Sequence, residues 1–423
     1  MEHVRSYYAA SANPAPARAA LQGEATADVC VIGGGIAGCS TALHLAERGY
    51  RVALLEGRRI AWGASGRSGG QAIFGFAAGQ DKLVAQVGRE TARRMFDVSV
   101  EALDLLRERV ARHSIDCDLN WGQMHVAIKP RHETELKAWR EELAGQYAYE
   151  SLRWLEREEV RQLLDTDRYL GGLHDSRSGH LHPLNYTLGL AAAAEAAGAV
   201  IHEASHVTRL DHGDTVVVHT PGGRVRAKHV ALCCNAYVDD LSPRLRARIM
   251  PVGTYIVATE SLGPARMQAL MRENVAVTDV NWVLDYFRRS ADHRLLFGGR
   301  VSYSGLDPLN TARATRARML KVFPQLADVK IEYSWGGYVD ITMSRAPDFG
   351  RLAPNVYYLQ GFSGHGIALT GMAGRLVAET IAGQSGRFDM FAKLEHRDFP
   401  GGPLLRTPAL VLAMLWFRLK DLL

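Results

Sequence analysis

The sequence predicts an α/β fold in which a discontinuous first domain is combined with an α+β domain that contains an antiparallel sheet. Three observations lead to this prediction. At 29–55, an apolar run, a glycine-rich turn, an amphipathic segment and a second apolar run follow one another. At 361–383, another glycine-rich turn leads into helix-like sequence. Between them, at 250–299, apolar segments are spaced like the strands of an antiparallel sheet.

Composition narrows the class of protein. The chain has 423 residues, of which 47% are hydrophobic and 22% charged, as in ordinary globular proteins. The formal charge of +5 is spread along the chain, so we do not expect a nucleic-acid partner. No secretory signal and no membrane-spanning run of about 18 apolar residues is evident. The cysteines form no CxxC pair, which predicts a reducing, cytoplasmic location.

The first elements can be placed individually. Residues 1–21 are expected to form an Ala/Pro-rich arm on the surface. A buried strand is expected at 29–32, because this apolar run ends in three glycines. Residues 36–48 have helical spacing, with Ile36, Leu43 and Ala46 on one face and Gly49 as the terminator. Val52–Leu55 is the second strand, which completes a strand–turn–helix–strand unit.

The later elements follow the same patterns. Helices are expected at 82–113, 131–147, 156–164 and 311–323, and a helix that runs into a strand at 182–203. Strands are expected at 121–128, 207–210, 215–219, 229–236, 252–258, 282–288, 295–299 and 355–361. The glycine-rich turn at 361–366 is followed by a further expected helix, which ends near residue 383.

The turn at 33–38 matches the GxGxxG pattern in the strand–turn–helix context that the pattern requires. Gly33 permits a tight turn, Gly35 lets a pyrophosphate approach, and Gly38 lets the helix pack on the strand. Pyrophosphate charge would face the helix N-terminus. Glu56, at the end of the second strand, would accept hydrogen bonds from ribose hydroxyls, which argues against NADP. The alternative is a glycine-rich turn without a ligand.

Two further motifs favour FAD over NAD. Small residues crowd 63–71, where they would let backbone lie along a large planar ligand; a mobile surface loop is the alternative. At 361–367 a second strand–turn–helix junction could stabilise negative charge on another part of the same ligand. A reduced flavin carries such charge, whereas NAD has no equivalent need.

Together these motifs make the chain resemble the D-amino acid oxidase superfamily, and within it the gamma-glutamylputrescine oxidase group. The resemblance rests on SYY at 6–8 with Ala9 and Ser11, VIGGG at 31–35, WGASGRSGGQ at 62–71, GHLHP at 179–183, YSWGG at 333–337 and GFSGHG at 361–366. It covers nearly the whole chain. Ser68 stands where the group usually has Asn, so one contact near the flavin is absent or altered.

The resemblance implies a Rossmann-like FAD-binding domain at 1–85, 155–240 and 340–423, and a substrate domain at 86–154 and 241–339. It implies oxidation of an amine C–N bond in gamma-glutamylputrescine or a similar amine. Hydride would pass to flavin N5, the imine would hydrolyse to an aldehyde, and oxygen would be reduced to hydrogen peroxide. One alternative is a dehydrogenase that passes electrons to a quinone or carrier protein. Another is a flavin-binding subunit with little turnover.

The resemblance and the motifs together suggest a set of cofactor residues, with FAD held non-covalently because no cysteine follows Cys234. The residues expected to contact FAD are Gly33, Gly35, Ile36, Ala37, Gly38, Glu56, Gly57, Arg58, Gly63, Ala64, Ser65, Gly66, Arg67, Gly69, Gly70, Gln71, Val207, Asn235, Gly337, Gly361, Gly364, His365, Gly366 and Ile367.

Flavin amine oxidation needs orienting residues more than a strong base. We expect Trp335, His365 and Arg67 in this role, and a substrate pocket that includes Tyr255, Trp282, Tyr286 and Arg300. A substrate carboxylate would suit an arginine, with Arg67, Arg288, Arg300 and Arg345 as the candidates.

Two remaining features are ambiguous in the sequence. His180 and His182 form an HxH pair without further evident ligands, so no metal is expected. The apolar segment at 407–418 is either a packed C-terminal helix or a weak membrane or partner contact.

Overall fold

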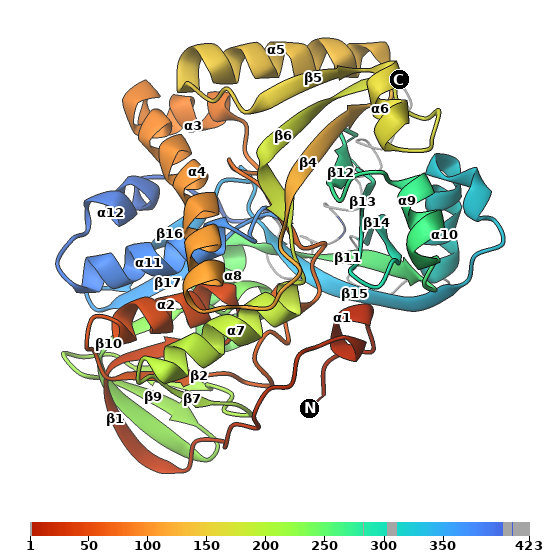
Figure 1. Cartoon of the computed structure of the whole chain (residues 1–423). Coiled ribbons are helices and arrows are strands. Elements are labelled where there is room, and N and C mark those ends of the chain that lie inside the picture. The colour runs from red at the N-terminus through yellow and green to blue at the C-terminus, as the bar shows by residue number, and fades with distance from the viewer. Residues whose placement is uncertain (1, 282, 303–310, 401–407, 409–423) are drawn as a thin grey trace.

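The computed structural model describes residues 2–281, 283–302, 311–400 and 408, which form two sheets with helices packed around them (Figure 1). The predicted α/β class is confirmed. The apolar segment at 407–418 and Trp282 lie outside the described residues, apart from position 408. None of the helices in the described ranges is long and apolar enough to cross a membrane.

The first sheet contains the predicted strand–turn–helix–strand unit. Its order is β16–β17–β10–β1–β2–β7, and every neighbouring pair is parallel except β16 with β17. The bounds are β1 (Gly23–Ile32), β2 (Val52–Leu55), β7 (Val200–His202), β10 (Gly223–Leu232), β16 (Asp348–Ala353) and β17 (Val356–Gln360). The short strands β8 (Arg209–Asp211) and β9 (Val216–Thr220) extend β10 in antiparallel fashion.

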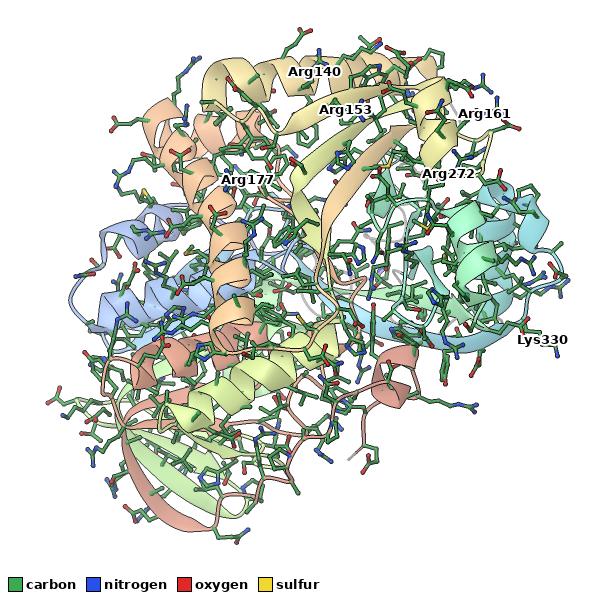
Figure 2. The ribbon with its side chains drawn as sticks, viewed as in Figure 1. Arg140, Arg153, Arg161, Arg177, Arg272 and Lys330 are labelled. Atoms are coloured by element: carbon green, nitrogen blue, oxygen red, sulfur yellow. The ribbon has the colours of Figure 1, made fainter. Side chains whose placement is uncertain are left out.

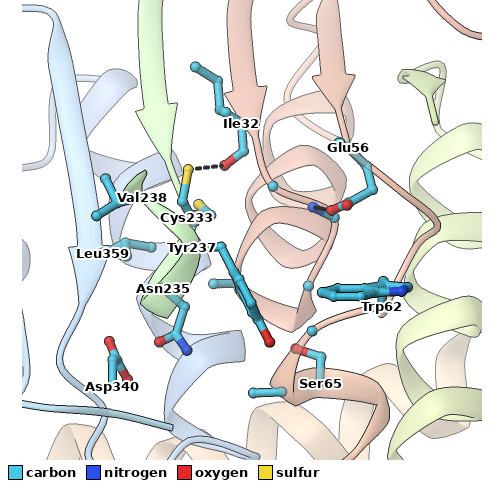
Figure 3. Close-up of a pocket in the computed structure, with 18 of the residues that line it drawn as sticks. Ile32, Glu56, Trp62, Ser65, Cys233, Asn235, Tyr237, Val238, Asp340 and Leu359 are labelled. Carbon is cyan, nitrogen blue, oxygen red and sulfur yellow. Dashed lines mark hydrogen bonds between the residues drawn. The ribbon is translucent and has the colours of Figure 1, made fainter. Parts of the chain in front are cut away.

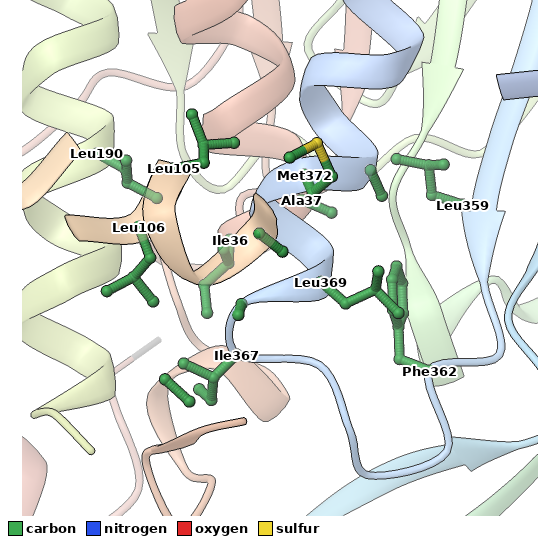
Figure 4. Packing of buried hydrophobic residues seen from close by; sticks show 14 of the residues in the cluster. Ile36, Ala37, Leu105, Leu106, Leu190, Leu359, Phe362, Ile367, Leu369 and Met372 are labelled. Carbon is green, nitrogen blue, oxygen red and sulfur yellow. The ribbon is translucent and has the colours of Figure 1, made fainter. Parts of the chain in front are cut away.

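Four helices share one hydrophobic core beside this sheet: α2 (Ile36–Ala46), α4 (Arg89–Arg112), α7 (Pro183–Ala196) and α11 (Leu369–Ile381). Figure 4 shows Leu105 and Leu106 of α4 close to Ile36 of α2 and to α11. A Cβ added at Gly374 of α11 would lie 2.7 Å from the Thr41 nitrogen, so this glycine lets α11 approach α2 closely. The close packing fixes the start of α2, where the glycine-rich turn ends.

The second sheet is mostly antiparallel, with the order β15–β11–β14–β13–β12–β4–β6–β3 and β5 paired to β6. Only β12 and β4 run parallel among its described pairs. Its strands are β3 (Gln71–Ala72), β4 (Asn120–Ala127), β5 (Leu152–Glu156), β6 (Gly171–His180), β11 (Met250–Thr259), β12 (Ala276–Asp279), β13 (Tyr286–Arg289), β14 (Leu295–Ser302) and β15 (Ile331–Ile341).

Helices cover the outer side of this second sheet. They are α5 (Pro130–Tyr147), α6 (Arg157–Leu163), α9 (Gly263–Leu270) and α10 (Thr311–Val322). The remaining helices are α1 (Tyr7–Ala10), α3 (Gln80–Val87), α8 (Pro243–Arg248) and α12 (Gly386–Ala392). The helix expected at 82–113 is divided into α3 and α4, because Gly88 has a φ of +78°.

The boundaries predicted for the two domains stay a prediction, but two strands pair differently from the segments in which they were placed. Both β3 and β6 fall in segments assigned to the FAD-binding domain, yet they pair within the second sheet. Strand β6 joins β4 and β5, so the sheet draws on residues before and after the boundary at 155. A pairing between distant segments has no local signal in the sequence.

The N-terminal arm is exposed or half-buried at 2–5 and 9–20, as expected, but its tyrosines are buried. Residues Tyr7–Ala10 form helix α1, in which Tyr7 is 4% exposed and Tyr8 is 0% exposed. Farther along the arm, Arg18 forms two hydrogen bonds of 2.8 and 2.7 Å with Glu195 of α7. The arm therefore contributes to the core, and its alanine and proline content concealed the two buried tyrosines.

Basic side chains around the second sheet come from separate elements, as Figure 2 shows for Arg140, Arg153, Arg161, Arg177, Arg272 and Lys330. Several of them pair with acids: Arg153 with Glu159 at 2.7 Å, and Arg177 with Asp104 at 2.7 Å. In each such pair the acid offsets the positive charge of the arginine.

Candidate cofactor cavity and active site

A cavity of about 460 Å³, called the cofactor cavity below, opens at the carboxyl ends of β1 and β10 (Figure 3). It is lined mainly by segments 32–37, 55–58, 62–65, 206–208, 233–241 and 362–370, with Asp340 and Leu359. The crevice beyond the carboxyl ends of parallel strands is where α/β proteins bind ligands. The motifs that predicted a dinucleotide site thus meet around one cavity.

The glycine-rich turn between β1 and α2 leaves room for a ligand at the helix start. Gly33 has a φ of +107°, and its N–H donates to the Leu55 carbonyl at 2.8 Å. A Cβ at Gly38 would lie 1.8 Å from the Gly33 carbonyl oxygen, so packing requires glycine there. The Ile36 N–H donates to Ser65 Oγ at 3.0 Å. Residues 33–37 at the N-terminus of α2 line the cavity, and the positive end of the helix dipole there suits an anion.

Glu56 stands at the end of β2 with each carboxylate oxygen bound by a backbone donor. Oε2 accepts from the Gly34 N–H at 2.6 Å, and Oε1 accepts from the Arg58 N–H at 2.8 Å. Burial raises the pKa of Glu56, while these two hydrogen bonds favour the charged form. Each oxygen keeps a lone pair with which a ribose hydroxyl can bond.

Trp62 separates two guanidinium groups at the cavity. The Cζ atoms of Arg58 and Arg67 each lie 4.0 Å from the centre of its ring. Arg67 Nε donates to the Trp62 carbonyl at 2.7 Å, and burial lowers the pKa of Arg67. Arg67 Nη2 and the Tyr237 hydroxyl are buried without a hydrogen-bond partner among the described residues. Two unpartnered polar groups beside a cavity fit a polar ligand.

Asp340 joins three segments at the floor of the cavity. It is 2% exposed, and its Oδ2 accepts a hydrogen bond from the Gly361 N–H. The side-chain amide of Asn235 is oriented so that its nitrogen donates to both carboxylate oxygens of Asp340 at 2.6 Å, while its oxygen accepts from the Ala236 N–H at 3.2 Å. Burial raises the pKa of Asp340 to about 7. Figure 3 shows Asn235 directed toward Asp340.

The C-terminal glycine-rich turn forms another wall. Gly364, Gly366 and Ile367 line the cavity, whereas His365 does not. The His365 Nε2 atom lies 2.7 Å from the Phe74 carbonyl oxygen, so Nε2–H is the donor. Burial lowers the pKa of His365, and its ring is therefore neutral and serves to anchor the turn.

The expected FAD contacts divide into two groups. Those that line the cavity are Gly33, Gly35, Ile36, Ala37, Glu56, Gly57, Arg58, Gly63, Ala64, Ser65, Val207, Asn235, Gly364, Gly366 and Ile367. Those that do not line it are Gly38, Gly66, Arg67, Gly69, Gly70, Gln71, Gly337, Gly361 and His365. Several of the second group let backbone pack closely; a Cβ at Gly66 would lie 2.2 Å from the Ala61 carbonyl oxygen.

Trp335 lies behind the cavity lining. It is 4% exposed, and its indole N–H donates to the Arg67 carbonyl at 2.9 Å. The structure thus gives this ring a supporting position, and not the substrate-orienting position that the sequence suggested. A tryptophan next to two glycines gives no indication of which side of the loop it occupies.

The expected pocket residues on the second sheet are partly described. Tyr255 is buried in β11, and Tyr286 of β13 lies where a Cβ at Gly69 would come within 2.7 Å of its ring. Trp282 and the side chain of Arg300 are outside the described set. Arg345 lies between β15 and β16 with a φ of +62°.

Arg288, a candidate for a substrate carboxylate, is instead used inside the protein. It is 3% exposed; Nε donates to the Gly69 carbonyl at 2.9 Å, and Nη2 donates to the Tyr8 hydroxyl at 3.1 Å. The HxH pair is likewise engaged. His180 Nε2 lies 3.2 Å from the Asn274 carbonyl oxygen, and His182 Nδ1 accepts from the Asn185 N–H at 3.1 Å.

The lining residues that were missed in the sequence include Trp62, Tyr237 and Asp340. Each adjoins a recognised motif, at 63–71, at Asn235 and at 333–337 respectively. For Trp62 and Tyr237 a signal was available, because residues that follow strands of an α/β sheet point to its ligand crevice. Asp340 lies within β15 of the second sheet and had no such signal.

Comparisons with known proteins agree with this geometry. The family model described as "FAD dependent oxidoreductase" matches residues 28–380. The chain is 43% identical to the gamma-glutamylputrescine oxidoreductase of Escherichia coli K12 over 99% of both chains. It is 41% identical to the probable oxidoreductase OrdL of Haemophilus influenzae, over 99% of this chain and 98% of that protein.

The fold also matches a solved structure, the glycine oxidase of Geobacillus kaustophilus. The TM-score is 0.74 at 22% identity, and the match covers 88% of this chain and all of that chain. The turn at α2, the carboxylate of Glu56 and the unpartnered groups at Arg67 and Tyr237 all fit FAD. The chain belongs to the family of FAD-dependent oxidoreductases, as its resemblance to the D-amino acid oxidase superfamily indicated.

Proposed function

We propose that the chain oxidises the C–N bond of gamma-glutamylputrescine or a similar amine, with oxygen as the electron acceptor. One observation carries the substrate class: the 43% identity with the E. coli gamma-glutamylputrescine oxidoreductase extends over 99% of both chains. In the overall reaction a primary amine, oxygen and water give an aldehyde, ammonia and hydrogen peroxide. A cytoplasmic location stays a prediction from the cysteine pattern.

The chemistry that bound FAD would supply is acceptance, at flavin N5, of a hydride from the carbon beside the amine nitrogen. The N-terminus of α2 and the glycines at 33 and 35 hold the pyrophosphate, and Glu56 accepts hydrogen bonds from ribose hydroxyls. The lining residues of segments 63–71 and 361–367 would confine the rest of the cofactor. Neutral His365 fixes the second of these segments through the Phe74 carbonyl.

The second sheet supplies the substrate side in this proposal. Tyr286 reaches Gly69 from β13, and Tyr255 packs beside Gly336 of β15. Aromatic rings in such positions exclude water and can hold a cationic or neutral amine. Because Arg288 is bonded to Gly69 and Tyr8, a substrate carboxylate would need another partner. Arg67, Arg300 and Arg345 remain the candidates from the sequence.

The experiment is an anaerobic visible spectrum of the purified protein before and after addition of gamma-glutamylputrescine. Rapid loss of the flavin band followed by peroxide formation in air is the expected result. Bleaching without peroxide would favour the dehydrogenase alternative, in which a quinone or carrier protein takes the electrons. A flavin band that this substrate leaves unchanged would overturn the substrate, and a panel of polyamines and amino acids would follow.

A further inference from the structure

Tyr8 of the N-terminal helix lies at the centre of the supports that hold one wall of the cofactor cavity. The wall is the segment 63–71, called the glycine loop below; Gly63, Ala64, Ser65 and Ser68 contribute its lining atoms. Tyr8 itself is 0% exposed and comes from a part of the chain far from this loop in sequence. Its hydroxyl and its ring both contact residues that bind the loop.

Backbone carbonyls of the glycine loop accept hydrogen bonds at three successive points. The Trp335 indole N–H donates to the Arg67 carbonyl at 2.9 Å. Arg288 Nε donates to the Gly69 carbonyl at 2.9 Å. The Leu181 N–H donates to the Gly70 carbonyl at 2.8 Å. The donors come from β15, from β13 and from the segment just after β6, so no single element holds the loop.

Two of the three supports contact Tyr8 directly, and the third adjoins one of its neighbours. The Tyr8 ring centre is 5.2 Å from that of Trp335, with the rings edge to face. It is 4.9 Å from the ring centre of His182, which directly follows Leu181. The Tyr8 hydroxyl accepts a hydrogen bond from Arg288 Nη2 at 3.1 Å. Removal of this one residue would loosen the supports from Trp335 and Arg288 and remove a contact of His182, which follows the third donor.

The first half of the loop is held by its own backbone hydrogen bonds, from Gly66, Arg67 and Ser68 to the carbonyls of Gly63 and Ala64, whereas the carbonyls of Gly69 and Gly70 are bound from outside the loop. A Cβ at Gly69 would lie 2.7 Å from the Tyr286 ring, and one at Gly70 would lie 2.2 Å from the Leu181 carbonyl oxygen. Glycine is therefore required at both positions for close packing. Glycine also leaves the free backbone with more conformations to lose on ordering.

We infer that Tyr8 is a positioning residue that pre-orders the glycine loop for FAD, acting through the guanidinium group of Arg288. When only part of the cofactor-free population has the binding conformation, the apparent affinity falls by that fraction. A Tyr8 that fixes the loop keeps that fraction high. The inference concerns the cofactor and does not depend on which amine is oxidised.

The test compares Tyr8→Phe with Tyr7→Phe in the full-length protein. Both variants lose one hydroxyl from adjacent, buried tyrosines of α1, but the Tyr7 hydroxyl interacts with Ser290 and Asp292 and not with the glycine loop. The FAD dissociation constant is measured by reconstitution of the cofactor-free protein. Thermal unfolding is recorded with and without FAD.

A hydrogen bond to a charged partner contributes roughly ten- to a hundredfold when it is made directly to the ligand. Because Tyr8 acts only through Arg288, we expect Tyr8→Phe to raise the FAD dissociation constant about three- to tenfold, with Tyr7→Phe close to wild type. A purely structural role would lower the unfolding temperatures of both forms equally and leave the constant unchanged, which would overturn the inference. Equal increases in the two variants would overturn it as well.

A double variant tests the route through Arg288. If Tyr8 acts through this guanidinium group, Tyr8→Phe on an Arg288→Lys background produces no further increase in the FAD dissociation constant. Independent, multiplicative effects of the two substitutions would overturn that route. The conservative lysine keeps the buried charge, so that the comparison does not depend on a protein that has lost its fold.

Discussion

The side-chain amide nitrogen of Asn235 lies 2.6 Å from both carboxylate oxygens of Asp340. Asn235 follows β10, Asp340 lies in β15, and the Gly361 N–H that also binds this carboxylate follows β17. Asn235 and Gly361 both have positive φ, at +52° and +77°. One buried carboxyl group thus fixes two backbone conformations that are unfavourable for most residues, at the floor of the cofactor cavity.

Substitution of Asp340 by Ala should weaken both the fold and cofactor binding. The change leaves the Asn235 amide and the Gly361 N–H buried without their acceptor, at a cost of about 2 kcal/mol in the free energy of unfolding. Asp340→Asn keeps one carbonyl oxygen as an acceptor, so its free energy of unfolding and its flavin content should fall less than those of Asp340→Ala. Chemical unfolding and flavin content measure the two effects. Equal unfolding free energies for wild type and Asp340→Ala would contradict the role assigned to this carboxyl.

The Gly35→Val substitution should yield a folded protein without FAD. A Cβ at Gly35 would already lie 2.8 Å from Ser65 Oγ, and the larger valine would fill the space in front of the N-terminus of α2. Gly145→Ala in α5 is the matched control, because no atom lies within 4 Å of its added Cβ. The visible spectrum and the circular dichroism of both variants are the measurements. Normal flavin content in Gly35→Val would refute this pyrophosphate site.

Local patterns in the sequence predict the elements of the first sheet well. The unit from β1 to β2 is specified by an apolar run, by glycines with positional roles and by a helical period, all within about 30 residues. Glu56 follows from its position after β2. These features depend on near neighbours in the chain, and near neighbours are what a single sequence displays.

Features that depend on distant segments could not be predicted in the same way. Trp335 lies behind the glycine loop, and Arg288 bonds Gly69 and Tyr8, because three separated segments pack together. Asp340 was missed for the same reason: its partners come from positions 235 and 361. Residue type indicates that a buried Arg or Asp needs a partner, but the topology selects which partner.

Asp279 should make the stability of the protein depend on pH. It is 2% exposed, and burial, with the nearby charge of Asp285, raises its pKa to about 7. Arg318 bonds Asp285 at 2.6 Å and favours the charge there, so Asp279 is the member of the pair that holds the proton. The folded state then binds a proton that the unfolded state has already released.

The sign follows from this difference in proton binding. The proton on Asp279 contributes its full share to the free energy of unfolding below the ordinary pKa of an aspartate. Between that pKa and about 7 this contribution falls by roughly 1.4 kcal/mol per pH unit, and above about 7 it is lost. Asp279→Asn should remove this contribution, so that its unfolding free energy falls less between pH 5 and pH 7. The exposed Asp214→Asn variant is the control. Equal pH slopes for wild type and Asp279→Asn would exclude a proton on Asp279.

Glu56→Gln should weaken FAD binding while the fold is retained. Both carboxylate oxygens accept backbone N–H groups, from Gly34 and Arg58, so the amide group of glutamine would place a donor against one of them. A lost charge-assisted hydrogen bond predicts an increase of roughly ten- to a hundredfold in the FAD dissociation constant. Exposed Glu158 of α6, changed to Gln, is the control. An unchanged constant for Glu56→Gln would mean that the ribose hydroxyls do not need this carboxylate, and that Glu56 serves only to order the turn before α2.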